Sequence, residues 1–270
     1  MTVFQSSWNA QSPQAVARRE AMLARLAALR ALEDRAAQAS ARAKPMFDKR
    51  GQLLPRERVA LLLDPGAPFL PLSSIAGYLQ DTPKAEASIP GGGMIAGIGF
   101  VSGVRCVVVA SDSGIDAGAI QHMGREKALR AQEIALQNRL PFVHLVESAG
   151  ANLMKYRVEG FVHGGALFRN LARLSAAGLP VITVQHGSGT AGGAYMPGLS
   201  DVVIMVQLCG VSAAAELAYT AGRGQITVAL LRPSEPDLML KMADMLTTSF
   251  PDVLNLCVDL RQRLSVYPED

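Results

Sequence analysis

The chain has 270 residues, of which 49% are hydrophobic and 18% are charged, and its formal net charge is +3. This composition excludes a largely disordered chain, and the absence of a run of about 18 apolar residues argues against a membrane-spanning helix. Its three cysteines, Cys106, Cys209 and Cys257, are too far apart for a disulfide framework or a clustered zinc site. We therefore expect a reducing, cytoplasmic location, with no secretory signal and no metal.

The positive charge is concentrated near the N-terminus. Residues 1–58 contain 11 Lys and Arg against 5 Asp and Glu. Such a region could meet anionic ligands, but the chain has only 5% aromatic residues and no nucleic-acid recognition motif. Binding to nucleic acid is therefore not expected.

The first predicted elements are helical. Residues 13–43 are rich in Ala, Leu and Arg, and apolar residues recur three or four positions apart, which predicts an amphipathic helix packed on its own domain or on a partner. Pro45 ends this pattern. A second helix is predicted over residues 55–63, with Pro55 in its first turn. We expect residues 1–50 to form a helical arm.

An α/β pattern follows the arm. Two β-branched runs, residues 91–101 and 105–110, flank Ser102-Gly103 and predict a hairpin. Helices and strands then alternate, which favours several parallel strands buried on both faces. In chain order we predict a helix over 124–138, a strand over 140–146, a helix over 161–177, and strands over 180–185 and 201–206.

Two glycine-containing segments, residues 147–153 and 187–195, each follow a predicted strand. Ligands of α/β sheets bind beyond the carboxyl ends of strands, where glycine lets backbone N–H groups approach a ligand closely. Two such loops side by side would provide a pair of donors for one anionic oxygen, an oxyanion hole. The alternative is that these glycines only allow tight turns and close packing of helix on strand.

A dinucleotide-binding dehydrogenase is one competing interpretation. Gly187, Gly189 and Gly192 match the glycine spacing of that motif, but no acidic residue follows at the expected distance. Pro197 also leaves little room for the long helix that such a motif opens.

A serine hydrolase is a second competing interpretation. Ser188 lies two residues after His186, and Ser148 follows Glu147. A nucleophile needs a base within hydrogen-bond reach, and neither serine lies in a G-x-S-x-G elbow. A serine close to a histidine or a glutamate in a loop is more commonly an ordinary polar residue of that loop.

Two long runs resemble the carboxyltransferase β subunit of acyl-CoA carboxylases. They are residues 129–153 (LRAQEIALQNRLPFVHLVESAGANL) and 161–206, which contains LFRNLARLSAAGLP and AGGAYMPGLSD. Residues 51–78 and 91–112 resemble the opening helix, first strand and first hairpin of the same family. The likeness includes propionyl-CoA carboxylases and is closest to the methylcrotonoyl-CoA and geranyl-CoA branch. It implies a crotonase-like fold, a layered β-β-α domain over residues 51–206.

This resemblance implies a carboxyltransferase component of a biotin-dependent carboxylase. The domain would bind an acyl-CoA and stabilise its enolate for carboxyl transfer from carboxybiotin on a partner carrier protein. The resemblance assigns the catalytic backbone donors to Gly192, Gly193, Gly150 and Ala151. The other residues expected to contact the CoA ester are Ala149, Ala191, Ala194 and, from their charge alone, Arg125, Lys127 and Arg130. A solvated helix face is the commoner explanation of those three charges.

Residues 207–270 depart from the family pattern. They lack its Gly-Pro-Pro-containing segment and are too short for the second crotonase-like domain, which supplies the biotin side of the site across a subunit interface. Within them we predict only a strand over 225–231 and a helix over 236–249. The alternatives are therefore a catalytically incomplete assembly subunit or fragment, or a subunit like the malonate decarboxylase β subunit. Expected partners are a biotin carboxylase or carrier subunit and either further copies of this chain or a second carboxyltransferase half, but no membrane.

Overall fold

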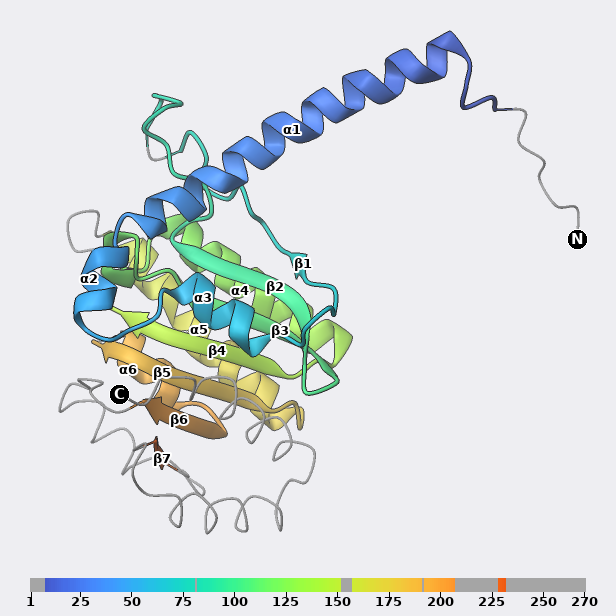
Figure 1. The fold of residues 1–270 in the computed structure, drawn as a ribbon. Helices are drawn as coiled ribbons and strands as arrows, with labels where there is room; N and C mark the ends of the chain where they lie inside the picture. The colour runs from blue at the N-terminus through green and yellow to red at the C-terminus, as the bar shows by residue number, and fades with distance from the viewer. Residues whose placement is uncertain (1–7, 81, 152–156, 191, 207–227, 232–270) are drawn as a thin grey trace, which may run out of the picture.

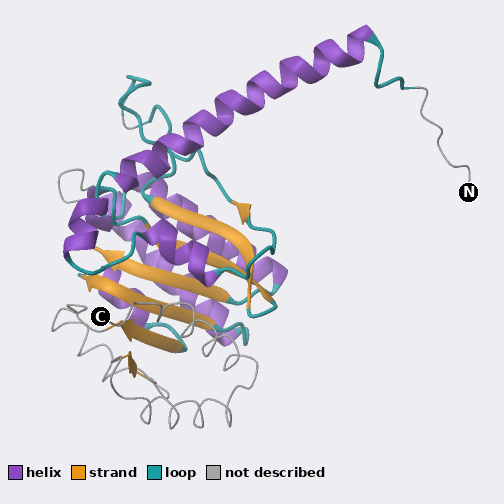
Figure 2. Cartoon of the chain, in the orientation of Figure 1, coloured by secondary structure: helices purple, strands orange, loops and turns teal. Residues whose placement is uncertain are grey.

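The computed structural model describes residues 8–80, 82–151, 157–190, 192–206 and 228–231. These residues form a seven-stranded sheet with helices on both faces and a long N-terminal helix that projects from it (Figure 1, Figure 2). The helices are α1 (Pro13–Ala41), α2 (Lys44–Lys49), α3 (Pro55–Leu62), α4 (His122–Asn138), α5 (Val158–Ala176) and α6 (Gly192–Gly198), with a short 3-10 turn, η1 (Asp116–Gly118). The strands are β1 (Leu70–Pro71), β2 (Met94–Val101), β3 (Val104–Ser111), β4 (Phe142–Ser148), β5 (Val181–Gly189), β6 (Val202–Val206) and β7 (Val228–Leu231).

The strands lie in the sheet in their sequence order. β1, β2 and β3 are antiparallel, whereas β3 through β7 are parallel. The predicted β2–β3 hairpin is confirmed. Ser102 and Gly103 have φ of 53° and 77°, as a tight two-residue turn requires, and the Asp64 carboxylate accepts both of their N–H groups at 2.8 Å.

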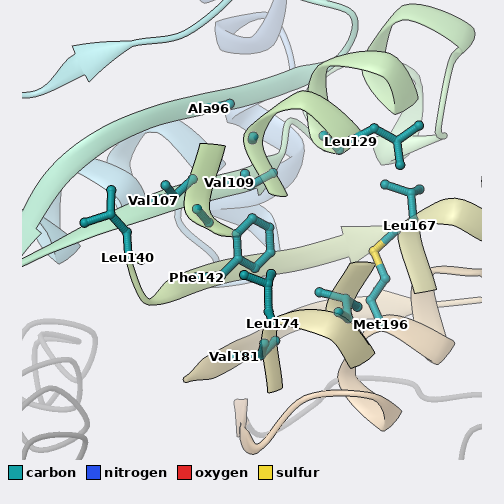
Figure 3. Close-up of a cluster of buried hydrophobic side chains, with 14 of the residues drawn as sticks. Ala96, Val107, Val109, Leu129, Leu140, Phe142, Leu167, Leu174, Val181 and Met196 are labelled. Carbon is teal, nitrogen blue, oxygen red and sulfur yellow. The ribbon is translucent and has the colours of Figure 1, made fainter. Parts of the chain in front are cut away.

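Alternate residues of the central strands pack into two separate cores, because successive side chains of a strand point to opposite faces. On β3, Cys106, Val108 and Ala110 pack with α3, and Val107 and Val109 pack with the helices of the other face. Figure 3 shows this second core, in which Phe142 lies among side chains from α4, α5 and the sheet. Burial on both faces explains why these strands read as continuous apolar runs.

The helical arm begins where the sequence predicts a helix. Ser12 caps it, since its Oγ accepts the N–H of Ala15 at 3.2 Å, and Pro13 occupies the first turn. The helix ends at Ala41, and α2, which was not predicted, starts just before Pro45. Proline is tolerated in a first helical turn, so Pro45 both ends one helix and fits the next.

The C-terminal end of α1 docks on the sheet through Ser40. Its Oγ donates to Asp112 Oδ1 at 2.5 Å, and Arg56 Nε lies 3.2 Å from Asp112 Oδ2. Gly114 lies so close to Ser40 that a side chain there would overlap it. Burial raises the pKa of Asp112, opposed by the hydrogen bond from Ser40 and the charge of Arg56.

The predicted strand over 225–231 is represented by β7, which pairs with β6. The predicted helix over 236–249 lies outside the described residues. Among the helices that are described, none has both the length and the apolar character needed to cross a bilayer.

Candidate functional site

A cavity of about 1470 Å³ lies where the first turns of α4, α5 and α6 meet. The two glycine-containing loops contribute Ala151 and Gly192 to its lining. α4 contributes Arg125 among other polar residues, and α5 and α6 contribute Phe168 and Met196. Segments far apart in sequence therefore surround one space. Its lining is mostly polar along α4 and mixed along α5, where Arg157, Glu159 and His163 lie beside apolar side chains.

The two glycine-containing loops lie side by side, as two neighbouring parallel strands require. The N–H of Thr190 donates to Ser148 O at 3.0 Å, and Ser148 pairs with Gly189 across a register shift between β4 and β5. A Cβ added at Gly193 would lie 2.8 Å from Ser148 Cβ. Glycine at 193 thus allows α6 to start directly against the end of β4.

Three backbone amides that were expected to face a ligand are instead bonded within the protein. The N–H of Gly193 donates to Thr190 O at 2.9 Å, and the N–H of Ala149 donates to Ala117 O at 3.1 Å. The N–H of Gly150 donates to Ser148 Oγ at 3.1 Å. Of the four expected donors, Gly193 and Gly150 therefore already have an acceptor for their N–H groups within the protein.

The remaining two expected donors, Ala151 and Gly192, line the cavity. Gly192 is the first residue of α6, and the first N–H groups of a helix have no partner within it. Ala151 forms a bridge with Ile120, in which Ile120 N–H donates to Gly150 O at 2.7 Å. Among the described residues, neither the Ala151 nor the Gly192 N–H has a hydrogen-bond acceptor.

Of the alanines expected to contact the CoA ester, Ala149 and Ala194 lie in different surroundings. Ala149 is held in the β4 loop by its bond to Ala117, and Ala194 is buried in α6, 2% exposed and away from the cavity lining. Burial leaves the Ala194 side chain no surface for a ligand. Ala191 lies outside the described residues.

Arg125 lines the cavity and ties its two helical walls together. Its Nη1 donates to Gly160 O in the first turn of α5 at 2.8 Å, and its Nη2 lies 3.1 Å from Glu126 Oε1. Glu126 also lies 3.3 Å from His163 Nε2 on α5. Arg125 is therefore engaged mainly in holding α4 against α5.

Lys127 and Arg130 do not face the cavity. Lys127 is 5% exposed, and its Nζ donates to the backbone oxygens of Met94 at 2.7 Å and Gly91 at 3.4 Å. Arg130 is exposed and pairs with Glu133 at 3.1 Å. The ammonium of Lys127 is buried against the sheet, and burial lowers its pKa to about 8, so Lys127 is not placed to meet a ligand in this cavity.

Sequence reasoning missed Arg157, which is exposed, caps the start of α5 and lines the cavity. It also missed Phe168, whose ring approaches Gly192. A Cβ at Gly192 would lie 3.6 Å from Phe168 Cζ, and the Phe168 and Tyr195 ring centroids are 5.8 Å apart. Arg157 lies between the two family-like runs, and only its charge in a loop near a glycine-containing segment could have drawn attention to it.

The structure argues against the two competing enzyme classes. Gly187 and Gly189 belong to β5, and α6 has 7 residues and contains Pro197, so the glycines do not open a long dinucleotide-binding helix. His186 is buried, both of its ring nitrogens lack hydrogen-bond partners, and burial lowers its pKa well below the usual range. Neither Ser188 nor Ser148 is therefore activated by it, and Ser148 Oγ donates to Gly118 O at 2.8 Å.

No group of three or more His, Cys, Asp or Glu side chains in the described part of the chain is arranged to bind a metal ion. The charged side chains that line the cavity are Arg125 and Arg157 together with the carboxylates of Glu126 and Glu159. Glu126 lies 3.1 Å from Arg125 Nη2, so the backbone amides and Arg157 are the groups there that suit an anionic oxygen.

A family model described as the carboxyl transferase domain matches residues 47–214. Among curated relatives, a probable biotin-dependent acyl-coenzyme A carboxylase beta2 subunit of Mycobacterium tuberculosis is 48% identical over 158 residues, 58% of this chain and 28% of that protein. A probable mitochondrial methylcrotonoyl-CoA carboxylase beta chain of Drosophila melanogaster is 47% identical over 161 residues, 58% of this chain and 27% of its own. The matches thus span less than a third of these relatives.

The crystal structure of the geranyl-CoA carboxylase beta subunit of P. aeruginosa is similar with a TM-score of 0.71 and 44% identity. This likeness covers 99% of the present chain and 49% of that subunit. The transcarboxylase 12S hexamer core, at 20% identity and a TM-score of 0.61, shares the fold. The expected crotonase-like α/β fold and the resemblance to carboxyltransferase β subunits are confirmed.

Proposed function

We propose that this chain, which belongs to the carboxyl transferase domain family, forms the acyl-CoA-binding part of a biotin-dependent acyl-CoA carboxylase. One observation carries the proposal. Ala151 and Gly192 come from adjacent loops, line the same cavity, and have no hydrogen-bond acceptor for their N–H groups among the described residues. A thioester oxygen bound there would receive two backbone donors.

The two donors would act on the charge that develops as the acyl-CoA becomes an enolate. Backbone N–H groups held in place need no reorganisation during the reaction, so they stabilise the enolate oxygen more than the neutral thioester. The N–H of Gly192 lies at the start of α6, where helix amides favour negative charge. Removing one such donor typically costs about 2.7–4 kcal/mol in the transition state.

The rest of the cavity suits the other parts of a CoA ester. Phe168 and Met196 provide apolar surface beside Gly192 for the acyl group. Arg157, which has no ion pair among the described residues, is the best placed cation for a CoA phosphate, and Arg125, which is paired with Glu126, also lines the cavity. We infer that Arg157 takes the role expected of Lys127 and Arg130.

Carboxybiotin on a partner carrier would supply the carboxyl group, and we assign none of the described residues to it. We propose that a second carboxyltransferase half, from another chain or from further sequence, completes that side of the site. The division into an arm (1–50), an acyl-CoA domain (51–206) and an atypical tail (207–270) belongs to the same proposal.

Two substitutions at Gly192 test the donor. Gly192→Pro removes the N–H at a first helical position, where proline is tolerated. Gly192→Ala keeps the N–H and adds a Cβ at an ordinary 3.6 Å from Phe168. With carboxybiotin carrier, the second carboxyltransferase half and acyl-CoA supplied, we expect Gly192→Pro to lower kcat about 10²- to 10³-fold and Gly192→Ala to lower it far less.

Calorimetric titration with a series of CoA esters separates this function from that of an assembly subunit. A chain that binds carboxylase partners but no CoA ester would be an assembly subunit, and the proposal would fail. Equal loss of kcat in both Gly192 variants would remove the donor role while leaving acyl-CoA binding intact.

A further inference from the structure

The projecting part of α1 is exposed to solvent along most of its length. Every residue from 16 to 31 is exposed, and the helix leaves the domain as a straight rod (Figure 1). Five large apolar side chains lie in this stretch, namely Val16, Met22, Leu23, Leu26 and Leu29, with exposed fractions from 38% to 55%. Helices are stabilised mainly by packing an apolar face, so this stretch presents a surface that a partner would cover.

Three of these apolar side chains, Met22, Leu26 and Leu29, share a face with the residues that dock α1 on the domain. Positions 15, 22, 29 and 36 and positions 19, 26, 33 and 40 each repeat every seven residues, and together they form one heptad seam. Near the domain this seam buries Ala36 and Ser40. Farther along it carries Met22, Leu26 and Leu29, flanked by Arg19 and Glu33. The docking face of α1 thus continues beyond the domain.

The seam is complementary to itself in the antiparallel direction. Arg19 and Glu33 lie seven residues before and after Leu26, two helical turns away in each direction on the same face. Neither side chain forms an ion pair with any described residue. If a second helix runs antiparallel with its Leu26 on the first Leu26, each Arg19 faces the Glu33 of the other helix.

We propose that α1 binds α1 of a second copy of this chain, antiparallel and centred on Leu26. Leu26 packs on its own counterpart, and Met22 of each copy packs against Leu29 of the other. Arg19 and Glu33 close both ends with two equivalent ion pairs. Such an interface is isologous, because the same patch is used on both copies, and it closes a dimer.

The charged residues set the register more than the affinity. A polar residue in a seam is tolerated where its counterpart satisfies it and disfavours other registers. A shift of one heptad would place Glu33 or Arg19 against an apolar side chain. Parallel pairing would bring Arg19 against Arg19 and Glu33 against Glu33, which like-charge repulsion disfavours.

Cysteine cross-linking tests direction and register in the full chain. In the antiparallel arrangement, Leu26→Cys brings each cysteine onto its counterpart, within disulfide reach. Met22→Cys separates the two cysteines by about 12 Å along the helix axes, from eight residues at 1.5 Å each. We expect oxidation to give covalent dimers with Leu26→Cys, and no more with Met22→Cys than with the wild-type chain, which carries three cysteines of its own.

Charge reversal tests the ion pairs in the Leu26→Cys background. Glu33→Arg places Arg19 against a second arginine, and we expect the cross-linking rate to fall about tenfold. Arg19→Glu together with Glu33→Arg restores opposite charges and should restore the rate. Glu20→Arg is the matched control, since it makes the same change in charge on an exposed residue about 120° round the helix from Leu26.

Circular dichroism of each variant checks that α1 stays helical. Cross-linking of Leu26→Cys that survives Glu33→Arg, or is not restored by the double reversal, would overturn the ion pairs and the register. Cross-linking at both cysteine positions would mean parallel pairing, and its absence at position 26 would mean that the arm has another partner. Either result overturns the proposal without bearing on acyl-CoA binding.

Discussion

Gly193 at the start of α6 lies directly against Ser148 at the end of β4. A Cβ added at Gly193 would come within 2.8 Å of Ser148 Cβ and 3.2 Å of both Ser148 oxygens. This approach keeps the two glycine-containing loops together and sets the distance between the amides of Ala151 and Gly192. The proposed donor pair depends on it.

Replacement of Gly193 by alanine should therefore push α6 away from β4. We expect the free energy of unfolding to fall by about 1–3 kcal/mol, as for other overpacked sites, and the Kd for a CoA ester to rise. Urea denaturation and calorimetric titration measure the two effects. Gly192→Ala, whose new Cβ has room, should change stability much less, and equal losses in both variants would argue against close loop packing.

Ser148 is expected to be a structural residue rather than a nucleophile. Its Oγ donates to Gly118 O at 2.8 Å and accepts the N–H of Gly150 at 3.1 Å. Ser148→Ala leaves two buried backbone groups without partners, so we expect a loss of about 1–3 kcal/mol in urea denaturation. A fluorophosphonate probe should leave the wild-type chain unlabelled, and labelling abolished by Ser148→Ala would contradict this role.

Lys127 should make stability depend on pH. Burial lowers the pKa of Lys127 from 10.5 to about 8. The charge of Arg56 adds a smaller decrease, and the charge of Asp112 opposes both. Between these values the unfolded chain binds more protons than the folded one, so this group makes the free energy of unfolding rise with pH. Lys127→Met removes the ammonium. The free energy of unfolding of the wild type minus that of the variant should therefore increase from about pH 8 to about pH 10. A difference that stays flat or falls would show that the ammonium is not desolvated.

Arg125 and Arg130 offer a matched pair on one helix. Arg125→Ala breaks the bond to Gly160 that joins α4 to α5, so we expect a loss of about 1–2 kcal/mol and weaker binding of CoA esters. Arg130→Ala removes an exposed pair with Glu133 and should change stability by at most about 0.5 kcal/mol. Differential scanning calorimetry and CoA ester titration compare the two, and similar effects on both would contradict the role of Arg125.

The order of helices and strands could be predicted because its signals are local. Ser102-Gly103 turns the hairpin through positive φ values, and the apolar runs of β4 and β5 pair as parallel strands. Their glycine-containing loops therefore meet at one edge of the sheet, as the strand order requires. The two long runs that resemble the carboxyltransferase family contain these loops, so the resemblance pointed to the same site.

The direction of each amide could not be predicted, because it depends on backbone angles that glycine leaves open. Gly193 and Gly192 are adjacent, yet one N–H turns back to Thr190 O while the other residue lines the cavity. The roles of Arg125, Lys127 and Arg130 on α4 could not be told apart from the sequence for a related reason. Residues two and five positions apart differ in direction by about 200° and 140° on a helix, so similar side chains meet different surroundings.

The sequence by itself determined the α/β layering and the two glycine-containing loops after parallel strands, because these follow from local pattern and chain order. The family was indicated by the resemblance of two long runs. Only the tertiary structure decided that Ala151 and Gly192 line the cavity and that Lys127 is buried. It also exposed the apolar seam of α1. Each of these depends on which face of an element meets another, and that is set by packing across the whole domain.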